Sequence, residues 1–145
     1  MVTGTINALE VTRLFDIERL IFFSSIGALP TIQYDPVDCN HPTIMAAEGP
    51  GVYGAAKVAG EAFCWAYRQS YNIDSVAIRP TATCGVGTRN QQYLNPIVEG
   101  ALRGKPVHFD HGHEVPRDYV HVDDVGGITL AALDAPAAKL HHRGF

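Results

Sequence analysis

The sequence predicts an α/β fold in which short buried strands alternate with helices. Two apolar runs, Leu20–Phe23 and Ser75–Ile78, lie between polar residues, which is typical of strands buried on both faces of a parallel sheet. Segments 2–15 and 51–71 precede these runs, contain no proline and repeat apolar residues at helical spacing, so each is expected to be a helix. Because strands separated by helices join through right-handed crossovers, this order favours a parallel sheet.

The remaining elements are expected from shorter signals. Residues 26–50 contain four prolines and two glycines, which predicts a long loop. Asp123 and Asp124 are expected to open a last helix that ends near Leu133, because carboxylates cap helix N-termini and match the positive end of the helix dipole. Between the second strand and this helix, the sequence predicts a loop at 81–90, a helix near 92–103, and short strands at 107–109 and 119–122.

The composition excludes several classes of protein. The 145 residues are 46% hydrophobic and 18% charged, as in a globular domain, and a net charge of −4 gives no basic surface for nucleic acid. No apolar run approaches the roughly 18 residues of a membrane-spanning helix, and no signal peptide opens the chain. Three scattered cysteines, Cys39, Cys64 and Cys84, indicate reduced thiols of a cytoplasmic protein rather than disulfides or zinc ligands.

The strongest chemical signal combines Ser25, at the end of the first expected strand, with Tyr53 and Lys57 at the start of the long helix. Residues at i and i+4 share a helical face, and a nearby cation lowers the pKa of a phenol from its usual value of about 10. A serine hydroxyl at a strand end can bind the same substrate oxygen. Such a group suits proton transfer during oxidation of a carbinol beside a nicotinamide. The alternative is an aromatic ring and an extended lysine on a helix surface.

Four stretches resemble, in the same order, the extended short-chain dehydrogenase/reductase family and its NAD-dependent epimerase/dehydratase group. They are GTINALE at 4–10, IFFSS at 21–25, YGAAKVAGE at 53–61 and RDYVHVDDV at 117–125. The resemblance implies the C-terminal part of a Rossmann-like, doubly wound parallel sheet with part of a small substrate-binding subdomain. Residues 1–80 would belong to the NAD(P)-binding domain, and residues 81–145 would carry the subdomain and a returning helix.

The resemblance also implies a role for individual residues. Tyr53 would be the acid/base, Lys57 would lower its pKa and contact the nicotinamide ribose, and Ser25 would hold the substrate oxygen. The residues implied to contact the cofactor are Ser24, Tyr53, Lys57, Arg79 and Pro80, and those implied to contact the substrate are Ser25, Thr83 and Arg117. The guanidinium of Arg117 suits a diphosphate, although an ion pair with a neighbouring aspartate is the alternative. No residue is expected to bind a metal ion.

The function implied is that of an NAD(P)-dependent nucleotide-sugar epimerase/dehydratase, acting by transient hydride transfer with NAD favoured over NADP. A homodimer formed through helices 2–15 and 51–71 is expected by the same resemblance. Two alternatives stay open. The protein could be a reductase or dehydrogenase of a non-nucleotide carbonyl or alcohol, or a non-catalytic fragment that keeps the fold.

Several positions depart from the family's pattern. Met1 stands where the family often has an asparagine of the catalytic network, and Ala82 stands where epimerases often have an asparagine. Cys84 occupies the position of a tyrosine in the loop that follows Arg79. The family's opening strand, its glycine-rich phosphate loop and the residue that selects NAD or NADP are not in this sequence. We therefore expect a segment of a domain about twice as long, truncated at both ends.

Two further patterns are expected to be coincidental. Residues 49–54 fit G-x-G-x-x-G, but a proline-interrupted loop precedes them instead of a strand, and Pro50 has no amide to donate. Histidines and an aspartate at 108, 110, 111 and 113 could bind a metal from one strand face, yet a solvated turn is the favoured interpretation.

Overall fold

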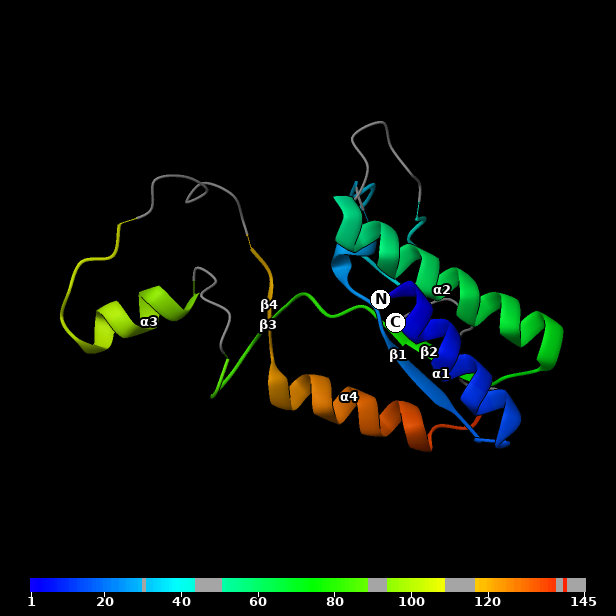
Figure 1. The fold of residues 1–145 in the computed structure, drawn as a ribbon. Coiled ribbons are helices and arrows are strands. Elements are labelled where there is room, and N and C mark those ends of the chain that lie inside the picture. The colour runs from blue at the N-terminus through cyan, green and yellow to red at the C-terminus, as the bar shows by residue number, and fades with distance from the viewer. Residues whose placement is uncertain (30, 44–50, 89–93, 109–116, 138–139, 141–145) are drawn as a thin grey trace.

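The computed structural model describes residues 1–29, 31–43, 51–88, 94–108, 117–137 and 140 (Figure 1). In chain order the elements are α1 (Val2–Leu14), β1 (Leu20–Phe23), the 3-10 helix η1 (Ile26–Ala28), α2 (Gly51–Tyr71), β2 (Ser75–Ile78), β3 (Ala82–Cys84), α3 (Leu94–Leu102), β4 (Tyr119–His121) and α4 (Val122–Asp134).

The parallel sheet predicted from the two apolar runs is confirmed. β1 and β2 pair in parallel over their whole length, with Leu20 opposite Ser75 and Phe23 opposite Ile78. The helices predicted at 2–15, 51–71 and 92–103 form as α1, α2 and α3. The last predicted helix also forms, as α4.

The sequence prediction is wrong at three places. Residues 82–84 of the predicted loop form β3, which pairs in parallel with β4, because partners some 37 residues away in the chain supply its hydrogen bonds (Ala82 lies opposite Tyr119). Residues 107 and 108 do not form a strand, and residue 109 lies outside the described residues. The side chain that caps α4 is His121, whose Nδ1 accepts from the Asp123 N–H at 3.3 Å, while Asp123 and Asp124 lie in the first turn.

Helices cover both faces of the β1–β2 pair, as Figure 1 shows. The cluster between the strands and helices α1 and α2 is built from Leu9, Cys64 and Ile73. The cluster on the opposite face, toward α4, is built from Val76, Ile78, Ala132 and Leu140. Burial on both faces explains why the two strands are apolar along their whole length rather than alternating. Burial also raises the pKa of the Cys64 thiol to about 11.

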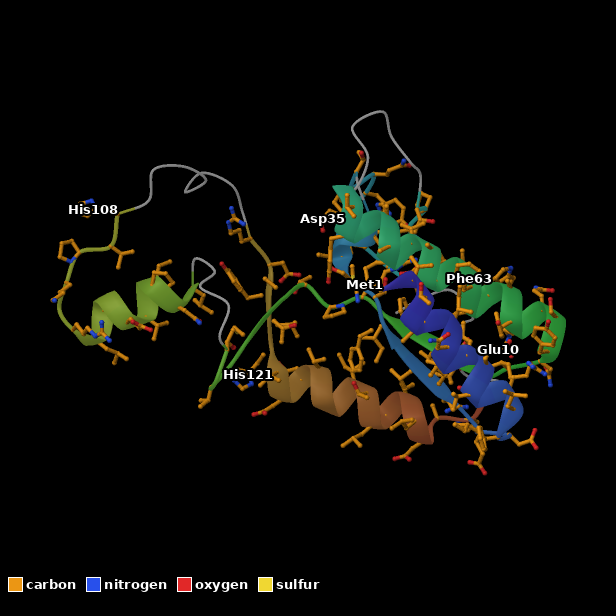
Figure 2. The ribbon with its side chains drawn as sticks, in the orientation of Figure 1. Met1, Glu10, Asp35, Phe63, His108 and His121 are labelled. Carbon is orange, nitrogen blue, oxygen red and sulfur yellow. The ribbon has the colours of Figure 1, made fainter. Side chains whose placement is uncertain are left out.

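Polar contacts tie α1 to α2 outside the core. The Tyr67 hydroxyl of α2 donates to Glu10 at 2.6 Å, and Arg13 forms an ion pair with the same carboxylate at 2.7 Å. Hydrogen bonds from Arg13 and then Tyr67 lower the pKa of Glu10, which Figure 2 shows on α1. The two helices are therefore joined at their polar edge as well as through the core.

The second strand pair, β3–β4, lies apart from β1–β2, and α3 lies beyond it in Figure 1. None of the residues of α3 is buried. α4 follows β4 without an intervening residue and extends from β3–β4 to the β1–β2 layer. This helix is therefore the structural link between the two strand pairs.

Two glycines in helices are expected to respond oppositely to alanine. At Gly60 of α2 a Cβ would lie in the ring of Phe22, within 2.9 Å of Cε1, whereas a Cβ at Gly126 of α4 meets nothing within 4 Å. Gly60→Ala should lower the free energy of unfolding by about 1–3 kcal/mol through overpacking. Gly126→Ala should raise it by about 0.5–1 kcal/mol, because alanine favours the helix. Urea unfolding followed by circular dichroism checks both, and stabilisation by Gly60→Ala would contradict the packing described.

Candidate active site

Ser25 lies just beyond the carboxyl end of β1, the edge at which ligands bind in open parallel sheets. Its backbone is extended, and its Oγ accepts a hydrogen bond from the Gly27 N–H at 3.1 Å, so that the serine caps η1. The hydroxyl is therefore fixed in position by the turn that ends the strand. The residue is half-buried rather than fully enclosed.

Tyr53 and Lys57 lie in the first two turns of α2, on the face that meets this strand end. The Lys57 Nζ donates to the Phe23 carbonyl at 2.6 Å, at the last residue of β1. The same ammonium lies 5.5 Å from the centroid of the Tyr53 ring and 5.4 Å from that of Phe22. The strand carbonyl thus holds the Lys57 ammonium beside the aromatic ring of Tyr53.

Gly27 shows how close Ser25 and Tyr53 lie. A Cβ built on Gly27 would contact the Ser25 Oγ at 3.4 Å and the Tyr53 Cδ1 and Cε1 atoms at 3.7 Å. The serine hydroxyl and the tyrosine ring therefore flank the same small space, and Lys57 adjoins it through the ring. Tyr53 is 53% exposed, so that a ligand can reach its phenol. The structure brings these three side chains into one cluster.

Ser24 and Arg79, which the resemblance places against the cofactor, both contact Glu61 of α2. The buried Ser24 hydroxyl donates to the Glu61 Oε1, and Arg79 donates to Oε1 at 2.8 Å and to Oε2 at 2.7 Å. The carboxylate raises the pKa of Arg79. The Pro80 carbonyl accepts from the Ile26 N–H at 3.1 Å. Glu61 is the last residue of the third motif, YGAAKVAGE at 53–61, and no role was predicted for it; its i+4 spacing from Lys57 was the available signal.

The substrate residues implied on the second strand pair lie in a different part of the molecule. Thr83 is exposed on β3, where its Oγ1 donates to the Thr81 carbonyl at 3.5 Å. Arg117 is exposed two residues before β4. Ser25 lies at the end of the first strand pair, so that a ligand touching all three residues would have to bridge the two pairs.

Two cavities adjoin α2. One of about 260 Å³ is bounded by the start of α1, by β1 and by Ala56 and Lys57, and Met1, labelled in Figure 2, lines it. The residue at the family's asparagine position therefore shares a cavity with Lys57. The other, of about 530 Å³, lies between residues 39–43, α2 and β2, and both Glu61 and Arg79 line it.

The reacting end of a nicotinamide cofactor fits the residues present. The Lys57 ammonium lines a cavity beside β1 and lies near the exposed Tyr53 ring, and the Ser25 hydroxyl lies near the same ring. These donors suit a ribose hydroxyl and a substrate oxygen. When bound, such a cofactor supplies the hydride acceptor of an alcohol oxidation.

The patterns expected to be coincidental lie partly outside the described residues. This holds for residues 49 and 50 of the glycine pattern, and for residues 110, 111 and 113 of the histidine pattern. Gly51 and Gly54 lie in the first turn of α2, and residue 108 lies in no strand. Within the described segments, no group of three or more His, Cys, Asp or Glu side chains could hold a metal ion. In the same segments no helix is long and apolar enough to cross a membrane.

A parallel α/β sheet covered on both faces, with its polar cluster at the carboxyl end of a strand, defines a Rossmann-fold protein. The chain belongs to the NAD dependent epimerase/dehydratase family, whose model matches residues 1–145. This family is the one that the four motifs indicated.

Relatives include epimerases and dehydrogenases. A UDP-glucose 4-epimerase of Mycolicibacterium smegmatis is 30% identical over 134 residues, covering 86% of this chain and 40% of that protein. The solved L-threonine dehydrogenase of Cupriavidus necator in its holo form is 27% identical with a TM-score of 0.85, covering 99% of this chain and 46% of that one. The UDP-glucose 4-epimerase of Thermotoga maritima is 28% identical with a TM-score of 0.74, covering 92% and 43%. The chain thus spans less than half the length of these proteins.

Proposed function

We propose that the protein is an NAD(P)-dependent epimerase/dehydratase that oxidises a hydroxyl of a nucleotide sugar and later reduces it again. The observation that carries the proposal is the clustering of the Ser25 hydroxyl, the Tyr53 ring and the Lys57 ammonium at the carboxyl end of β1. Arg117 and Thr83, on the second strand pair, are the proposed contacts for the substrate's diphosphate and sugar. Relatives named as UDP-glucose 4-epimerases support this choice of substrate class.

In this mechanism Ser25 orients the carbinol by a hydrogen bond to its oxygen, and the Tyr53 phenolate takes the proton from that oxygen as its carbon is oxidised. Lys57 lies beside the Tyr53 ring and would hold the ribose of the cofactor. When the carbonyl is reduced again, Tyr53 returns the proton to the oxygen. The enzyme side chains therefore end the cycle in the protonation states in which they began.

A second candidate is a dehydrogenase of a small, non-nucleotide alcohol. Two L-threonine dehydrogenase structures superpose with TM-scores of 0.85 and cover 99% of the chain, more than the epimerase structures do. Ala82 also lacks the amide that epimerases often present to the sugar. This candidate keeps Ser25, Tyr53 and Lys57 in the same roles and differs in releasing the oxidised product.

The two candidates are separated by what happens to the cofactor. The full-length protein is incubated with NAD and either UDP-glucose or L-threonine, while NADH absorbance and the chromatographic profile of the sugar nucleotides are recorded. Formation of an epimerised UDP-sugar without net NADH supports the first proposal. NADH formed in step with substrate consumption supports the second. Absence of turnover with both, and with their NADP counterparts, would contradict both.

We also propose that NAD is the cofactor, that the protein is a homodimer assembled through α1 and α2, and that it acts in the cytoplasm. Exposed apolar side chains on and after these two helices, among them Leu14, Phe15 and Trp65, support the choice of surface. The three free cysteines support a reducing compartment.

A further inference from the structure

We propose that Glu61 is a positioning residue, which fixes the end of β1 and so sets the distance between Ser25 and the Tyr53–Lys57 pair. The inference rests on the proposed function and extends it to a side chain outside the cluster of Ser25, Tyr53 and Lys57. It follows from contacts made by successive turns of α2.

Tyr53, Lys57 and Glu61 lie at i, i+4 and i+8, so that they follow one another along one face of the helix. Lys57 and Glu61 each form a hydrogen bond with a different residue at the end of β1. The Lys57 Nζ donates to the Phe23 carbonyl at 2.6 Å, and Glu61 accepts from the hydroxyl of Ser24. The two residues immediately before Ser25 are therefore each bound by a separate turn of the helix that carries Tyr53.

The Glu61 carboxylate also holds the end of the neighbouring strand. Arg79, just after β2, donates to both of its oxygens, and the two side chains are only 10% and 14% exposed. Backbone hydrogen bonds join the same strand ends, from Ser24 N–H to the Ile78 carbonyl at 2.8 Å and from Ile26 N–H to Pro80. One carboxylate thus connects α2 with the ends of both strands.

The hydrogen-bond partners of Glu61 indicate a structural role for its carboxylate. Its two oxygens accept hydrogen bonds from Ser24 and Arg79, so that it is engaged in structural contacts and not aimed at the space between Ser25 and Tyr53. Desolvation offsets much of the attraction within a buried ion pair. We therefore expect the Glu61–Arg79 pair to contribute more to the position of the strand ends than to the free energy of unfolding. Because small displacements of reacting groups cost much of the rate, loosening this end of β1 should lower kcat more than it changes KM.

Glu61→Gln tests the proposal, and Asp74→Asn is the matched control. Asp74 pairs with Arg19 at 2.7 Å, with side chains 12% and 20% exposed, at the opposite end of the same strands. Both variants remove the charge from a buried ion pair. At a temperature at which circular dichroism shows both variants folded, Glu61→Gln should lower kcat about 10- to 100-fold with KM within about threefold. Asp74→Asn should lower the melting temperature while leaving kcat unchanged.

Ser24→Ala provides a second, milder variant, because it removes the link from Glu61 to β1 and leaves the ion pair with Arg79. It should lower kcat about 10-fold without a comparable loss of thermal stability. Equal kcat values in Glu61→Gln, Ser24→Ala and the unmutated protein would overturn the proposal. So would a loss of kcat in Asp74→Asn as large as that in Glu61→Gln.

Amide hydrogen exchange separates this proposal from the proposed function. The Ile26 and Gly27 amides, which hydrogen-bond to Pro80 and Ser25, report the order of the strand end without requiring turnover. They should exchange at least about 10-fold faster in Glu61→Gln and at an unchanged rate in Asp74→Asn. If the unmutated protein turns over neither substrate class, the proposed function fails, and the exchange rates still decide the role of Glu61. Unchanged exchange in Glu61→Gln would overturn that role.

Discussion

Replacing Tyr53 by phenylalanine is expected to lower kcat by about 10²- to 10⁴-fold, the range for removal of a general acid/base. The variant removes one oxygen from a side chain that is 53% exposed. The ring that flanks Gly27 and faces Lys57 stays in place, so the fold and the position of Ser25 should not change. Steady-state kinetics on the substrate identified for the full-length protein, with circular dichroism to verify folding, provides the measurement.

Tyr71→Phe is the matched control for this experiment. Tyr71 is the last residue of the same helix and is also 53% exposed, but its ring contacts that of Tyr67 in a tilted arrangement and lies under Arg13. The kcat of Tyr71→Phe should stay within about twofold of the value for the unmutated protein, since surface substitutions outside the active site and the core have small effects. Full activity in Tyr53→Phe would remove the phenol from the mechanism, whatever the control shows.

Replacing Arg19 by methionine is expected to cause the largest loss of stability, about 3–5 kcal/mol in the free energy of unfolding. The guanidinium donates to Asp74 at 2.7 and 2.9 Å, and it reaches three carbonyls at the end of α4. These carbonyls belong to Ala132, Leu133 and Ala135, at 2.7, 2.9 and 2.6 Å. Methionine keeps the apolar stem, but it removes the hydrogen bonds of Arg19 to the largely buried Asp74 carboxylate. It also leaves the carbonyls at the end of α4 without their donor.

The control for Arg19→Met is Arg13→Met. Arg13 forms an ion pair of the same length, 2.7 Å, with Glu10, but both side chains are about one third exposed, at 36% and 35%. Solvent screens such a pair, so its loss should cost far less stability than the loss of Arg19. Urea unfolding of the two variants, at one ionic strength, gives the comparison. Similar losses in both would show that the contacts of Arg19 with α4 contribute little.

Elements with a strong local pattern were predictable from the sequence. The helix at 51–71 and the strands at 20–23 and 75–78 formed with their expected bounds, because apolar runs and proline-free helical spacing are local properties. β3 was missed because three residues carry no periodicity, and its hydrogen bonds come from β4, far along the chain. The capping of α4 by His121 was missed for a related reason: aspartates are the commoner caps, and the choice between neighbours depends on backbone geometry.

In the candidate site, too, the local features were predictable from the sequence and the long-range contacts were not. The shared face of Tyr53 and Lys57 follows from helix geometry, and the position of Ser25 follows from the end of an apolar run. The contact of Lys57 with a strand carbonyl, and the junction of Ser24 and Arg79 at Glu61, depend on how α2 crosses two strands. Such junctions join residues 18 to 37 positions apart in the chain, and no periodicity encodes them.

The continuity of β4 with α4 connects the proposed substrate residues to the anchor of α4 on the first strand pair. The strand that follows Arg117 becomes the helix without a hinge residue, and the far end of that helix is anchored by the side chain of Arg19. The positions of Thr83, on the paired strand β3, and of Arg117 therefore depend on this anchor. If these residues contact the substrate as proposed, loosening the anchor is expected to weaken substrate binding before it disrupts the core between α1, α2 and the strands.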